Sequence, residues 1–110
     1  MSAESESLAK KSNPPSPPPS LLHAVVRGKV QGVGFRQFLT EKAAVLGIRG
    51  TVRNLPDGRS VEVYAQGPQR SLDTLLAHLK RGPAGSRVLQ IEAAWQPPRD
   101  LPLGFFILPG

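Results

Sequence analysis

Residues 28–36, GKVQGVGFR, place three glycines and one arginine between a strand-like segment and a helix-like segment. Ahead of them, residues 22–30 alternate between apolar and polar side chains, which is typical of a strand with one buried face. Behind them, apolar residues recur at helical spacing, at Phe35, Leu39, Ala43 and Leu46. The stretch is therefore predicted to be a loop that joins a strand to a helix. The backbone N–H groups of such a loop and of the helix N-terminus can converge on one anion.

Arg36 falls in or beside the first turn of the predicted helix. A cation is unfavourable there, because a helix N-terminus already carries about half a positive charge. Either solvent screens the guanidinium or a bound anion compensates it. A tight glycine turn followed by a solvated arginine has the same spacing, so the residue pattern leaves both interpretations open.

The rest of the chain continues the pattern of strands and helices. Strands are predicted over 48–55 and 61–66, joined by the turn Pro56-Asp57-Gly58. A second helix follows Pro68 and ends near Gly82, with an apolar stripe formed by Leu72, Leu75, Leu76 and Leu79.

The C-terminal part predicts a fourth strand and leaves room for a short fifth one. The fourth strand is indicated by the alternation of Leu89, Ile91, Ala93 and Trp95, and the short one by Phe105 and Ile107. The order strand, helix, strand, strand, helix, strand is typical of the ferredoxin-like α+β fold. In that β-α-β-β-α-β fold, two helices cover one face of an antiparallel sheet.

Residues 1–20 differ in composition from the rest of the chain. They are polar, rich in proline and serine and free of aromatic residues, so we expect a disordered tail followed by a single domain over 21–110. They contain no apolar run of the kind found in a secretory signal. No segment is long and apolar enough to span a membrane, and we expect no membrane partner. The lack of cysteine favours a cytoplasmic location.

The formal net charge of +6 belongs to the predicted domain, because Glu4 and Glu6 balance Lys10 and Lys11 in the tail. Such a domain attracts anions. The charge alone does not distinguish nucleic acid, an acidic surface and a small phosphorylated molecule as the partner.

The segment GKVQGVGFR resembles the signature of the acylphosphatase family, Gly-x-Val-Gln-Gly-Val-x-Phe-Arg, and meets every fixed position. A second family segment resembles residues 50–58, GTVRNLPDG. Only Thr51 departs from it, since the family usually has an aromatic residue there. This departure concerns the packing around the second strand rather than the chemistry of Asn54. The resemblance extends over about residues 21–110 and implies the same ferredoxin-like fold.

The resemblance implies a phosphate site formed by the backbone of the loop, with Arg36 gripping the phosphoryl oxygens. The loop residues concerned are Gln31, Gly32, Val33, Gly34 and Phe35. A guanidinium group suits this role because it matches two phosphoryl oxygens bidentately. By the same resemblance, Asn54 orients the attacking water, a role that an amide can fill because it both donates and accepts hydrogen bonds. Taken alone, Asn54 could equally just start the turn at Pro56.

The sequence therefore predicts a monomeric cytoplasmic acylphosphatase, which hydrolyses a small-molecule acyl phosphate without a metal or cofactor. An alternative is a ferredoxin-like module that holds nucleic acid on its basic surface, although the chain has few aromatic residues for base stacking. Another is a domain for carbamoyl phosphate, similar to the acylphosphatase-like domain of hydrogenase-maturation proteins. The zinc-finger and carbamoyl-transfer regions that accompany that domain are not found here, so we do not expect this carbamoyl-phosphate function. The intact motifs and the few aromatic residues likewise argue against the nucleic-acid module.

Overall fold

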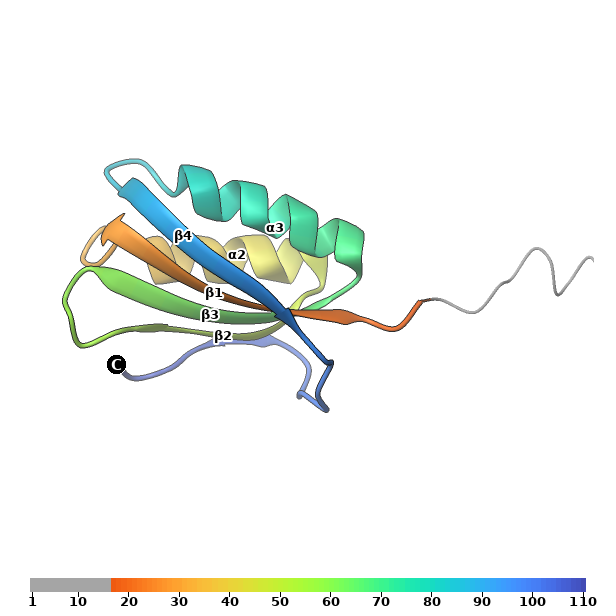
Figure 1. The fold of residues 1–110 in the computed structure, drawn as a ribbon. Coiled ribbons are helices and arrows are strands. Elements are labelled where there is room, and N and C mark those ends of the chain that lie inside the picture. The colour runs from red at the N-terminus through yellow and green to blue at the C-terminus, as the bar shows by residue number, and fades with distance from the viewer. Residues whose placement is uncertain (1–16) are drawn as a thin grey trace, which may run out of the picture.

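The computed structural model describes residues 17–110 and shows five strands and two helices in the predicted order (Figure 1). The elements are β1 (Ser20–Lys29), α2 (Phe35–Leu46), β2 (Arg49–Asn54), β3 (Ser60–Gly67), α3 (Gln69–Arg81), β4 (Arg87–Gln96) and β5 (Phe105–Ile107). Residues 1–16 of the predicted tail lie outside the described residues, and Ser20 already belongs to β1. None of the described helices is long and apolar enough to cross a membrane.

The strands form one sheet in the order β4-β1-β3-β2-β5, and both helices lie on the same face of it (Figure 1). Pairing is antiparallel from β4 through β2, and the predicted ferredoxin-like α+β fold is confirmed. The short fifth strand is present but runs parallel to β2, so the complete sheet is mixed. The reason is that residues 97–104 carry the chain from β4 across the end of the sheet, where it reverses direction before joining the opposite edge.

The core lies between the helices and the sheet. Leu22, Ala24 and Val26 of β1 are fully buried and pair with Ala65, Val63 and Val61 of β3. The predicted stripe of α3 faces this layer through Leu72, Leu75 and Leu79, all of which are fully buried. Burying one such leucine contributes about 1.5–3 kcal/mol, so these contacts hold α3 against the sheet.

The predicted strand β4 is present, but a bulge interrupts its apolar alternation at Leu89. Arg27 pairs with Gln90 whereas Gly28 pairs with Val88, so Leu89 is an extra residue in a β-bulge and is 69% exposed. Val88 packs against the core in its place. Gly28 is needed at this point, because its φ is +142° and a Cβ atom there would overlap the carbonyl oxygen of Arg87.

Thr51, which stands where the family usually has an aromatic residue, lies on the sheet face that the helices leave open. It pairs with Tyr64 on one side and Phe106 on the other, while its neighbours Gly50 and Val52 are buried on the helix side. The departure therefore affects packing on the outer face and leaves the core unchanged.

We expect the substitution Thr51→Tyr to stabilise the protein slightly. The new ring would lie between Tyr64 and Phe106, and cross-strand pairs of aromatic residues contribute about 0.2–1 kcal/mol each. Urea unfolding at equilibrium measures the change in the free energy of unfolding. A clear loss of stability would mean that this face does not accept a ring between these neighbours.

Candidate functional site

The loop between β1 and α2 takes its shape from two glycines. Gly32 and Gly34 have φ values of +73° and +76°, a left-handed conformation that other residues rarely adopt. Gly34 is also the N-cap residue, immediately before α2, and no side chain caps the helix there. The first backbone N–H groups of α2 therefore lack a side-chain acceptor, which leaves them available to an anion.

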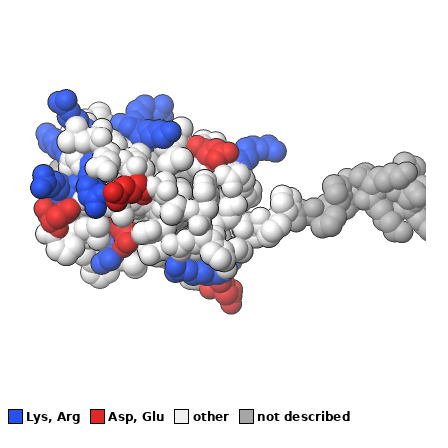
Figure 2. All heavy atoms as spheres, in the orientation of Figure 1, with Lys and Arg blue, Asp and Glu red and all other residues white. Residues whose placement is uncertain are grey.

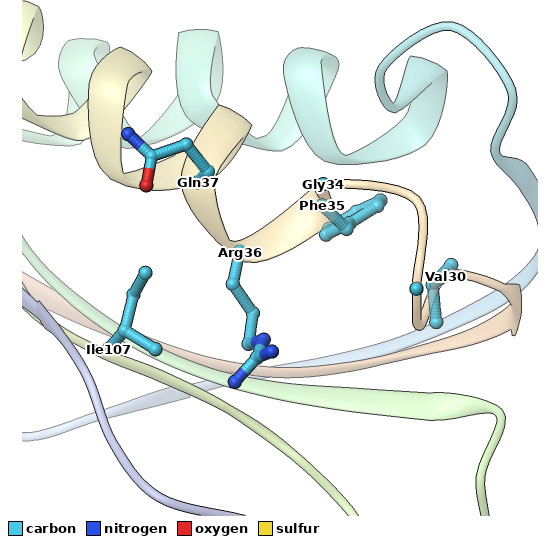
Figure 3. A pocket seen from close by; sticks show the side chains of 7 residues that line it. Val30, Gly34, Phe35, Arg36, Gln37 and Ile107 are labelled. Atoms are coloured by element: carbon cyan, nitrogen blue, oxygen red, sulfur yellow. The ribbon is translucent and has the colours of Figure 1, made fainter.

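Arg36 extends from the first turn of α2 into a cavity of about 230 Å³ beside this loop (Figure 3). Gly32 and Gly34 line the cavity with it, and the buried side chains of Val30 and Phe35 form its floor. Its remaining walls come from Gln37 and from Ile107 of β5. The structure thus brings together four of the predicted site residues, Gly32, Gly34, Phe35 and Arg36.

The electrostatics around Arg36 favour an anion. The first turn of α2 contains no acidic residue, and no carboxylate within residues 17–110 forms an ion pair with Arg36. Among the described residues, the guanidinium therefore has no acidic partner beside the positive end of the helix. Figure 2 shows further Lys and Arg side chains, interspersed with acidic ones, at the end of the sheet where β1 leads into the loop. This arrangement attracts negatively charged molecules to the cavity.

The side chain of Gln31 ties the loop to the β2–β3 hairpin. Its Nε2 atom donates hydrogen bonds to the carbonyl oxygens of Leu55 and Ser60, both at 2.9 Å. The Gln31 amide nitrogen is thus occupied within the protein, and only its backbone remains for the phosphate role that the resemblance implies. Val33, in turn, packs against the core and does not line the cavity.

We expect Gln31→Glu to destabilise the protein by about 1–3 kcal/mol, because a carboxylate would meet two carbonyl oxygens that now accept hydrogen bonds. Gln31→Met removes the donors without adding charge, so its free energy of unfolding should lie between those of the wild type and the Glu variant. Urea unfolding and the rate of substrate hydrolysis should both report the loss. Equal stability of the Glu variant and the wild type would show that the hydrogen bonds of Gln31 to the hairpin do not stabilise the loop.

Asn54 is the last residue of β2 and immediately precedes Leu55, whose carbonyl oxygen accepts a hydrogen bond from Gln31. It pairs with the buried Val61, so its side chain lies on the helix side of the sheet, as Arg36 does. Asn54 does not line the cavity around Arg36. Its Oδ1 atom is buried and has no hydrogen-bond partner among the described residues. Such an acceptor costs about 1–3 kcal/mol unless a donor satisfies it.

Two residues that sequence reasoning did not assign to the site come from the C-terminal segment. Ile107 lines the cavity, and Gly110 lies against the backbone of Asn54 so closely that a Cβ atom there would overlap the Asn54 carbonyl oxygen. Neither position belongs to a motif. The sequence indicated only a short apolar strand in this segment. That the strand lies beside β2, and so near the cavity, depends on the order of strands in the sheet.

The other polar candidates have structural roles. Hydrogen bonds from the hydroxyl of Ser60 and the N–H of Arg59 hold the pKa of Asp57 below its ordinary value, so this carboxylate belongs to the hairpin turn. His23 lies on the outer face of the sheet, where its Nε2 is 2.8 Å from the carboxylate of Glu62. Within residues 17–110, no group of three or more His, Cys, Asp or Glu side chains gathers to hold a metal ion.

Known proteins resemble this chain over the segments that carry Arg36, Asn54 and Ile107. A family model described as Acylphosphatase matches residues 22–107. The chain is 53% identical over 74 residues to the acylphosphatase of Thermus thermophilus, which covers 67% of this chain and 83% of that protein. It is 42% identical over 87 residues to the acylphosphatase of Pyrobaculum islandicum, with coverages of 79% and 92%. In structure it resembles the crystal structure of acylphosphatase from Bacillus subtilis, with a TM-score of 0.77 and 34% identity over 81% of this chain and 98% of that one.

Proposed function

The chain belongs to the acylphosphatase family of hydrolases, and from this premise we propose that it hydrolyses acyl phosphates to a carboxylate and inorganic phosphate at the cavity beside Arg36. The observation that carries the proposal is the Arg36 guanidinium, which forms no ion pair within residues 17–110 and lies next to the uncapped N-terminus of α2. An anionic phosphoryl group satisfies both at once, because it offers oxygens to the guanidinium and to the backbone N–H groups.

In the proposed complex, Arg36 and the backbone of residues 31–35 hold the phosphoryl oxygens. The transferred group carries its charge on three equatorial oxygens, so donors placed around it stabilise the transition state. Gly32 and Gly34 let the backbone approach these oxygens closely, because neither carries a side chain.

Asn54 is proposed to orient the attacking water. Support comes from its place on the helix side of the sheet and from its buried Oδ1, which lacks a donor that a water molecule would supply. The water oxygen forms a bond to phosphorus while the bond between phosphorus and the acyl oxygen breaks. The electron pair of that bond leaves with the carboxylate, and the proton of the water passes to a phosphoryl oxygen.

This route needs no general base from the protein. The leaving carboxylate is a weak base, so positioning and charge stabilisation supply the catalysis. Asp57 is held in the hairpin turn and takes no part. We also propose that the protein acts as a monomer in the cytoplasm without a nucleic-acid partner, because the sequence contains no cysteine and few aromatic residues for base stacking.

The proposed bond cleavage is tested by hydrolysing acetyl phosphate in water enriched in oxygen-18 and in the presence of EDTA. We expect the label in inorganic phosphate and none in acetate, because the water attacks phosphorus. Label in the acetate would show attack on the carbonyl carbon and would contradict the roles given to Arg36 and Asn54.

A further inference from the structure

The wall of the cavity opposite the loop is formed by an exposed apolar side chain, that of Ile107. Ile107 pairs with Val52, which places it on the helix side of the sheet, and it is 41% exposed. Figure 3 shows the Arg36 side chain extending from α2 toward the sheet, with Ile107 on one side and the loop that carries Gly34 on the other. A molecule whose phosphoryl group is held by Arg36 and the loop therefore has Ile107 next to its remaining part.

The other lining residues offer no comparable surface. Val30 and Phe35 are each only 1% exposed, and the two loop glycines have no side chain. The amide nitrogen of Gln37 is hydrogen-bonded to Glu41 at 3.2 Å along the helix. Arg36 is the one charged residue among those that line this cavity. Once Arg36 holds the phosphoryl group, none of the described lining residues is a second cation that could bind a carboxylate on the acyl part of the substrate. The lining therefore favours an uncharged acyl group.

We propose that Ile107 forms the binding surface for the acyl group and selects substrates whose acyl part is bulky and apolar, such as an aromatic or branched carboxylic acid. This inference rests on the proposed acylphosphatase function and adds a specificity-determining residue to it. A larger apolar acyl group buries more surface against Ile107 than an acetyl group does, and an apolar pocket discriminates between substrates by the surface they bury.

The test compares kcat/KM for benzoyl phosphate and acetyl phosphate in the wild type, Ile107→Ala and Ile107→Val. We expect Ile107→Ala to lower the ratio of benzoyl to acetyl kcat/KM roughly tenfold, chiefly through KM for benzoyl phosphate, because the loss of apolar contact equivalent to one methylene is worth about this factor. Ile107→Val should give an intermediate ratio. It also keeps the test decisive should the alanine variant fail to fold.

Phe106→Ala is the matched control, since Phe106 lies in the same strand but on the opposite face of the sheet. It should keep the wild-type ratio. An unchanged ratio in both Ile107 variants, with both substrates still hydrolysed, would overturn the role of Ile107 and leave the proposed function in place. Failure of the wild type to hydrolyse either substrate would instead contradict the proposed function itself.

Discussion

Arg36→Ala should lower kcat/KM for acyl phosphate hydrolysis by at least about a thousandfold while leaving the fold intact. In the proposed complex the guanidinium holds the phosphoryl oxygens as they gain charge, and among residues 17–110 no other cation lines the cavity to replace it. Stability should change little, because Arg36 is only partly buried and pairs with no carboxylate among the described residues. Steady-state kinetics and urea unfolding measure the two effects separately.

Two further variants make this result specific to the guanidinium. Arg36→Lys keeps the charge but loses the bidentate geometry, so it should recover only a small part of the lost activity. Arg70→Ala removes an exposed arginine from α3, away from the cavity, and should retain wild-type kinetics. An Arg36→Ala variant with wild-type kcat/KM would mean that the phosphoryl group is bound elsewhere.

Asn54→Ala should lower kcat about a hundredfold or more and change KM much less. The proposed contact of Asn54 is with the attacking water rather than with the phosphoryl group, so binding of the substrate should largely survive. Stability offers a second signature. Because the wild-type Oδ1 is buried without a partner, its removal should leave the free energy of unfolding equal to that of the wild type or raise it.

Thr51→Ala serves as the control in the same strand, because Thr51 lies on the opposite face of the sheet from Asn54. It should leave kcat unchanged. If Asn54→Ala instead raised KM strongly and kept kcat, Asn54 would belong to the phosphate-binding group and another residue would orient the water.

Local chemistry made the glycine-containing loop between β1 and α2, and both helices, predictable. Gly32 and Gly34 stand where the chain needs positive φ values, and the apolar stripe of α3 has a period that only a helix satisfies. The bulge at Leu89 was not predictable, because a strand register depends on the partner strand, here on the close approach of Gly28 to Arg87. Alternation in β4 alone therefore predicts the strand but not the bulge within it.

The candidate site likewise contains residues that a sequence motif indicates and residues that only the fold brings there. Arg36 and Asn54 lie in motifs that the sequence displays, and both side chains lie on the helix side of the sheet. The hydrogen bonds of Gln31 to the hairpin join segments more than twenty residues apart, and Ile107 reaches the cavity only because β5 adds to the sheet beside β2. Contacts of this kind follow from topology, so no local pattern could indicate them.

The central claim is that this cavity hydrolyses acyl phosphates, and the most direct test is the hydrolysis of benzoyl phosphate in EDTA, followed by the loss of ultraviolet absorbance. Wild type, Arg36→Ala and Asn54→Ala are compared at equal concentration after their folding is verified by circular dichroism. We predict rapid turnover by the wild type and rates near the uncatalysed background for both variants. No turnover by the folded wild type would contradict the claim and would leave the loop beside Arg36 as an anion-binding site without catalysis.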